Sequence, residues 1–144
     1  MSKPEAELIQ PLDELDNFSE AADALSELSE LDVQMAEKYA MDFLRNKKGD
    51  VQLQASSLEV LYAVKKSAAY QFIIENGSSV DPYIFKSMLG LVAEDCSLID
   101  DSPELTGVVR FLSSELSKFD NNGLSRIGDT ADWFKDTYSN LIET

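Results

Sequence analysis

The chain has 144 residues and no histidine, and its 27 acidic side chains outnumber its 12 basic ones, for a net charge of −15. This length favours one domain with a real hydrophobic core. A surface so negative repels phosphate groups, which argues against binding to nucleic acid or to an anionic membrane. The lack of histidine excludes a Ser-His-Asp or Cys-His catalytic group and a histidine-ligated metal site.

The acidic charge gathers toward both ends of the chain. Residues 1–44 hold 12 acids and 2 bases, residues 45–90 hold 4 and 6, and residues 91–144 hold 11 and 4. Solubility alone does not require this segregation, so the pattern favours binding to a basic protein, with plain solubility as the alternative. No apolar run approaches the roughly 20 residues that span a bilayer, and Met1 opens no secretory signal. We therefore expect a cytoplasmic protein.

The first stretch, residues 4–31, predicts one or two amphipathic helices. Leucine, phenylalanine and alanine recur there at steps of three or four, which places them on one helical face. Pro11 is expected to start or interrupt a helix, since it has no amide hydrogen to donate to the preceding turn. Ser19 offers a cap at which the helix would restart. The polar faces carry Asp13, Glu14, Asp16, Glu20, Asp23, Glu27 and Glu30.

Residues 32–64 predict two helices folded back on each other across a short basic turn. Asp32 and Asp50 each stand where a carboxylate could accept hydrogen bonds from the free amides of a first helical turn. Between them, the stretch from Arg45 to Gly49 puts cations beside a helix end, followed by a glycine that can take a positive φ. One hairpin cannot bury its own apolar stripe, so further helices must pack on it.

The rest of the chain predicts four more helices. The first runs from 67 to about 75, and Gly77 behind it would turn left-handed. The next two run over 82–95 and 103–119, where an aspartate or serine cap precedes a proline. A last helix is expected to start near Asp129, after a long connection over 119–129.

Because no stretch alternates apolar and polar residues, the predicted fold is all-α, with about seven helices in a single domain over 1–144. The hairpins would begin near residues 32, 67 and 103, at spacings within the range of helical repeat proteins. In this the chain resembles HEAT-like or armadillo-like α-solenoids. The resemblance implies a short right-handed stack of antiparallel helix hairpins over 32–142, preceded by the helices of 1–31. An irregular helical bundle is the alternative.

No residue pattern points to catalysis, a metal or a cofactor. The chain has no glycine-rich phosphate loop, and 118–129 fails as a calcium loop because Lys118 would stand at the first ligand position. The single Cys96 rules out an internal disulfide and fits a reducing compartment. Two carboxylates could do acid–base work, but no pair stands out, so we predict that the protein is not an enzyme.

Five carboxylates gather within a short stretch beside a predicted helix start: Glu94, Asp95, Asp100, Asp101 and Glu104. Like charges so close raise one another's energy, and a cationic partner relieves that repulsion. On the last predicted helix, three acids share one face around Trp133: Asp129, Asp132 and Asp136. A solvated acidic surface is the alternative to a docking site. Trp133 itself is expected in the core, although a partly exposed tryptophan ringed by acids would make a good anchor.

A small, acidic, all-helical chain of this kind resembles the bacterial immunity proteins that neutralise interbacterial toxins, including those of contact-dependent growth inhibition. The resemblance implies a cytoplasmic inhibitor that binds a basic toxin domain, often a nuclease, in a one-to-one complex through its acidic surface. The alternative is an α-solenoid adaptor that holds a basic peptide or protein subunit. Neither interpretation requires a cofactor, a nucleic acid or a membrane.

Overall fold

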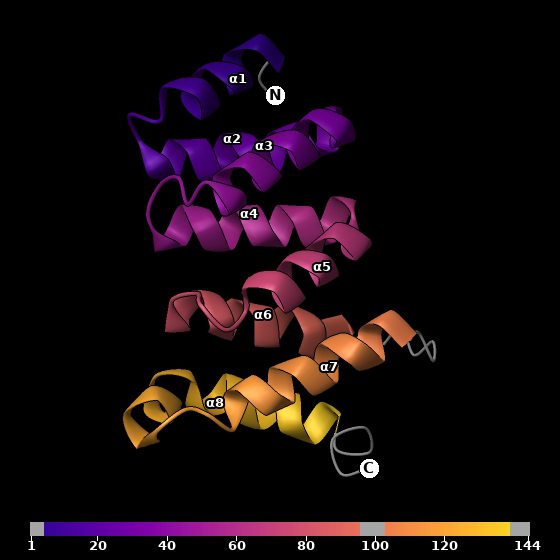
Figure 1. Ribbon diagram of the computed structural model, residues 1–144. Helices are drawn as coiled ribbons and strands as arrows, with labels where there is room; N and C mark the ends of the chain where they lie inside the picture. The colour runs from indigo at the N-terminus through magenta and orange to yellow at the C-terminus, as the bar shows by residue number, and fades with distance from the viewer. Residues whose placement is uncertain (1–4, 96–102, 139–144) are drawn as a thin grey trace. The chain divides into compact units, whose positions relative to one another are not determined.

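The computed structural model describes residues 5–95 and 103–138, which contain eight helices and no strand (Figure 1). The all-α prediction is confirmed, with one helix more than the seven expected. The chain divides into two compact units, Met1–Lys66 and Ser67–Thr144. The right-handed stack of hairpins over 32–142 and the single domain over 1–144 stay predictions.

The first unit opens with α1 (Glu5–Glu14) and α2 (Phe18–Leu31). Pro11 lies inside α1, and the break between the helices comes instead at Leu15, whose φ of 50° takes the chain out of the helix. Asn17 then caps α2, because its side chain accepts a hydrogen bond from a first-turn amide. The helix therefore restarts two residues before the serine that the sequence suggested.

The predicted hairpin is present as α3 (Val33–Arg45) and α4 (Val51–Val64), which pack against each other. Asp32 and Asp50 cap the two helices, each accepting a hydrogen bond from the amide three residues on, at 3.1 and 2.9 Å. Gly49 has a φ of 83° in the turn between them, as expected of a residue without a Cβ. All three features were predicted and are confirmed.

The core of the first unit joins the N-terminal helices to the hairpin, since α2 packs on α1, α3 and α4. Gln54 is a buried polar member of this core, and its Nε2 donates to the carbonyls of Phe43 and Lys48, both at 2.6 Å. This side chain thereby satisfies backbone groups at the end of α3. The fully buried large side chains are Leu8, Leu12, Leu25, Leu28, Phe43, Leu53, Leu58 and Leu61.

The second unit contains four helices: α5 (Lys66–Asn76), α6 (Pro82–Glu94), α7 (Pro103–Leu116) and α8 (Asn121–Thr137). Asp81 caps α6 as predicted, its carboxylate accepting a hydrogen bond from the Tyr83 amide at 2.8 Å. Helix α6 packs against α8, and the rings of Phe85 and Phe119 stack with their centroids 4.9 Å apart.

Helix α8 begins at Asn121, so the predicted start near Asp129 is wrong and most of the predicted connection over 119–129 is helical. The cause is Asp120, whose carboxylate accepts a hydrogen bond from the Gly123 amide at 2.7 Å and caps the helix. The cap outweighs the low helix propensity of the glycines behind it.

Gly77 has no positive φ, so the predicted left-handed turn behind α5 is wrong. A Cβ added at Gly77 would lie 2.6 Å from the Phe111 ring and 2.6 Å from the carbonyl oxygen of Ile73. The glycine is therefore required because its backbone approaches an aromatic ring of α7 closely, and a side chain would not fit.

Candidate protein-binding surfaces

Helix α8 exposes its acids on the side away from the core. The residues that it buries are Ile127, Ala131 and Phe134. Behind them, the Tyr138 hydroxyl donates a hydrogen bond to the carbonyl of Val92 on α6. The exposed acids are those predicted for this helix: Asp129, Asp132 and Asp136. We call these three residues with Trp133 the α8 acidic face; Arg126 and Lys135 are also exposed on the helix.

Trp133 is 46% exposed, so the expectation that it lies in the core is wrong. Successive residues of an α-helix point about 100° apart. Phe134 is fully buried, and Trp133, pointing about 100° away from it, is left exposed. It follows Asp132 directly, and Asp136 stands three residues on, within one helical turn. By helical spacing the indole shares its face with Asp129 and Asp136, and an exposed tryptophan in such a position could serve as an anchor.

The second predicted acidic group is only partly within the described residues. Asp100 and Asp101 lie outside them. Glu94, at the end of α6, is exposed, and so is Glu104 in the first turn of α7. A carboxylate in a first turn is favoured by the positive end of the helix dipole.

Asp95 departs from the exposed position expected of a docking residue. It is only 7% exposed, and its carboxylate accepts a hydrogen bond of 2.9 Å from the hydroxyl of Tyr70 on α5. A buried carboxylate needs such partners inside the fold, because it has lost its contacts with water. Asp95 therefore holds α5 and the end of α6 together and presents little surface to a partner.

An open groove of about 490 Å³ lies between α5 and α7, and no sequence pattern predicted it. The α5 wall includes Tyr70, Ile74 and Glu75, and the α7 wall includes Glu104 and Gly107. We call this the α5–α7 groove. Its lining is mostly apolar, while both glutamates are exposed.

One sequence signal could have revealed the groove. Ile73 and Ile74 are adjacent, so their side chains point about 100° apart on the helix and need not both reach the core. Ile73 is fully buried, and Ile74 is left 46% exposed. Across the groove, a Cβ added at Gly107 would meet no atom within 4 Å, so the space beside α7 is open.

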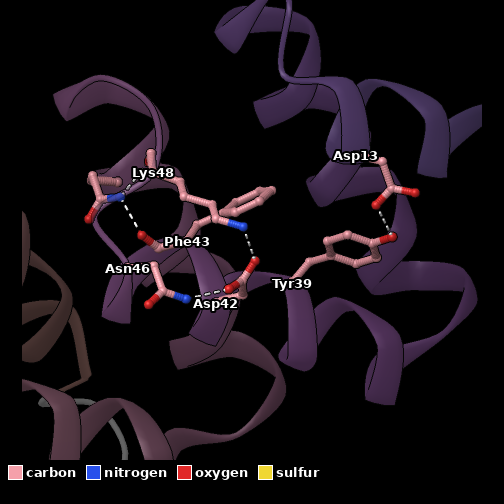
Figure 2. Close-up of polar contacts among 7 residues, drawn as sticks. Asp13, Tyr39, Asp42, Phe43, Asn46 and Lys48 are labelled. Carbon is pink, nitrogen blue, oxygen red and sulfur yellow. Dashed lines mark hydrogen bonds and ion pairs between the residues drawn. The ribbon is translucent and has the colours of Figure 1, made fainter.

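In the first unit, two acids besides the aspartates that cap α3 and α4 form hydrogen bonds that support the fold. Asp13 accepts a hydrogen bond of 2.6 Å from the Tyr39 hydroxyl, which joins α1 to α3 (Figure 2). Asp42 accepts hydrogen bonds from Lys48 at 2.8 Å and from Asn46 at 2.5 Å (Figure 2). These contacts hold the end of α3 and the turn behind it.

The same contacts shift proton affinities. Partial burial, reinforced by the hydrogen bond to Asp13, raises the pKa of Tyr39 to about 12. The hydrogen bond from Lys48 lowers the pKa of the Asp42 carboxyl. A hydrogen bond shared with Asp32 raises the pKa of Glu5 in α1.

Helix α2 carries a second exposed acidic surface, which we call the α2 acidic face: Glu20, Asp23 and Glu30. Ion pairs within the described residues join Asp42 to Lys48, Glu37 to Lys65 and Glu115 to Lys118. No acid of the α2 or α8 acidic face forms an ion pair within the part of the chain that the structure describes. The acids of these two faces therefore form no close ion pair there, although Arg126 and Lys135 are also exposed on α8.

The described residues lack two other kinds of site. None of their helices has the length and apolar character that crossing a membrane requires. No three or more of their acidic or cysteine side chains are grouped so as to hold a metal ion. Comparisons with protein-family models, with curated proteins and with solved structures gave no match.

Proposed function

We propose that this chain is a bacterial immunity protein, an inhibitor that binds a basic toxin domain, such as a nuclease, in a one-to-one complex in the cytoplasm. The observation that carries the proposal is the α8 acidic face. There, three exposed carboxylates form no ion pair within the described residues and lie around a tryptophan that is 46% exposed.

The chemistry of this face suits a basic partner. A nuclease presents lysines and arginines to the phosphates of its substrate, and carboxylates can occupy the same positions. Complementary charge speeds the encounter and fixes its orientation, more than it adds affinity. Trp133 would supply the affinity that the charges do not, because a large aromatic side chain buried at the centre of an interface contributes much of the binding energy.

The α5–α7 groove favours a second candidate function, an adaptor that holds a basic peptide or subunit. A groove between two helices is a common place for a peptide to bind. The two functions differ in genetics. An immunity gene adjoins the gene of its toxin, and its loss is lethal when that toxin is made, whereas neither holds for an adaptor.

The deciding experiment uses the protein encoded by the gene that adjoins this one. Its expression in a bacterial host is expected to stop growth, and co-expression of this chain is expected to restore it. The two purified proteins should form a one-to-one complex whose association rate falls steeply as salt rises. If the neighbouring protein neither binds this chain nor is neutralised by it, the immunity function is wrong.

The site is tested by reversing charges in the same complex. Changing Asp129, Asp132 and Asp136 together to lysine should slow association by about tenfold or more and flatten its salt dependence. The matched control makes the same change at three acids of the α2 acidic face: Glu20, Asp23 and Glu30. Both variants alter the net charge equally. If only the control variant associates slowly, the α8 acidic face is not the binding surface.

A further inference from the structure

We propose that the α5–α7 groove is the docking site for one segment of the basic partner, which inserts an apolar side chain flanked by lysines or arginines. The inference rests on the proposed function, because it takes the partner to be basic. It adds a second contact to that of the α8 acidic face. The apolar part of the α5–α7 groove, which we call the apolar slot, receives an apolar side chain of the partner, and the acids beside it favour basic residues on either side of that side chain.

The slot exists because of two residues on facing walls. On α5, Ile73 occupies the core and leaves Ile74 in the groove, 46% exposed. On α7, Gly107 lines the groove without a side chain, and the position of its missing Cβ has no atom within 4 Å. Covering exposed apolar surface of this kind with an apolar group lowers the free energy and so favours binding.

The charges at the groove select a cationic segment. Glu75 on α5 and Glu104 on α7 both line the groove, are exposed and form no ion pair within the described residues. The Gln71 amide donates a hydrogen bond of 3.0 Å to the Glu75 carboxylate and so orients it. With one carboxylate on each wall, a cation on either side of the inserted side chain finds an opposite charge, whereas an acidic segment would be repelled.

One wall of the groove is held in place before any partner arrives. Tyr70 lines the groove, and its hydroxyl donates to the buried Asp95 at 2.9 Å; both residues are 7% exposed. A side chain fixed in this way loses little freedom when a ligand packs on it, which favours affinity. The groove's volume of about 490 Å³ also lies within the range of about 300–1,000 Å³ usual for ligand sites.

Gly107 allows the groove to be filled without disturbing the fold. Gly107→Leu puts a side chain into open space at a helical position where leucine is favoured over glycine. Gly107→Ala makes the same backbone change but leaves most of the groove empty. Ser114→Leu adds an exposed leucine to α7 two turns further on, outside the groove. An unchanged or raised melting temperature confirms that each variant is folded.

The probe is a fluorescein-labelled amphipathic peptide of lysine and leucine, compared with a lysine–serine peptide of equal charge and a glutamate–leucine peptide. We expect only the lysine–leucine peptide to bind the wild-type chain well. Its Kd should rise about tenfold in Gly107→Leu and stay unchanged in Gly107→Ala and Ser114→Leu. Glu75→Gln with Glu104→Gln should also weaken it and reduce the salt dependence of binding.

Several results would overturn the groove as the docking site. One is a lysine–leucine peptide that does not bind; another is a Kd that Gly107→Leu leaves unchanged. If the two lysine peptides bind equally well, charge alone is recognised and the apolar slot plays no part. These outcomes leave the proposed function standing, since that is judged separately by whether the chain neutralises the product of the adjoining gene.

Discussion

Tyr39 joins α1 to α3 through a single hydrogen bond, and that bond depends on a proton. The phenol donates to Asp13 at 2.6 Å, and its pKa is raised to about 12. An unfolded chain releases the same proton near pH 10, as a free tyrosine does. The stabilisation is therefore complete below about pH 10 and is lost as the pH rises from there to about 12.

Tyr39→Phe should remove both the bond and its pH dependence. At neutral pH the variant is expected to lose about 0.5–1 kcal/mol of unfolding free energy, since the bond is largely exposed. Between about pH 10 and 12 the wild-type chain should lose stability faster than the variant, so the two urea denaturation midpoints converge. Tyr83→Phe is the control, because that side chain is 47% exposed. Midpoints of wild type and Tyr39→Phe that stay equally far apart would contradict the raised pKa.

Exposure of single side chains was the least predictable property of this chain. Trp133 and Phe134 both fit the apolar pattern of α8, and only the position of α6 decides that Phe134 enters the core. Ile73 and Ile74 pose the same choice on α5. Asp95 looked like a surface acid, because a sequence does not show that Tyr70 would reach it from another helix.

Helix starts were predictable where the cap is a local pattern. The aspartates before α3, α4 and α6 were predicted from sequence and are confirmed, because each carboxylate bonds an amide only two or three residues away. The same pattern precedes α8 at Asp120, but the sequence predicted a connection over 119–129, where the glycines have low helix propensity. The low helix propensity of these residues argued against a helix and the capping aspartate argued for one, and the structure has the helix.

Asp120→Ala should therefore unravel the start of α8. The first half of this helix contains Gly123 and Gly128, so it has little intrinsic helix propensity once the cap is gone. We expect a loss of about 1 kcal/mol of unfolding free energy and faster hydrogen exchange of the amides from 121 to about 128. Asp129→Ala, an exposed acid in the middle of the same helix, is the control. Equal exchange rates in the two variants would mean that Asp120 does not hold the helix start.

The division into units was not predictable from the helix pattern. The sequence predicted one domain over 1–144, in which the helices of 1–31 precede the hairpins of 32–142. In the structure α2 packs on α3 and α4, and the boundary between the two compact units falls between Lys66 and Ser67. An apolar stripe indicates that one face of a helix is buried, but it does not show which other helix covers that face. The charge segregation was visible in the sequence, because charge can be counted without knowing the fold.

The net charge of −15 also affects the whole molecule's stability. So many like charges repel one another in the compact state, and exposed ion pairs such as that of Lys118 with Glu115 offset little of this. Surface carboxylates kept for a basic partner would therefore destabilise the free protein. Salt screens such repulsion between charges that lie more than about 10 Å apart at 0.1 M, and more than about 3 Å apart at 1 M.

Added sodium chloride should consequently raise the melting temperature of the free chain, by about 2–4 °C for each kcal/mol of repulsion removed. A variant that neutralises the α2 acidic face, with Glu20→Gln, Asp23→Asn and Glu30→Gln, should melt higher at low salt and gain less from added salt. Thermal melts followed by circular dichroism measure both effects. A wild-type melting temperature that falls with salt would show that internal ion pairs outweigh the repulsion, and that the acidic faces do not destabilise the free protein.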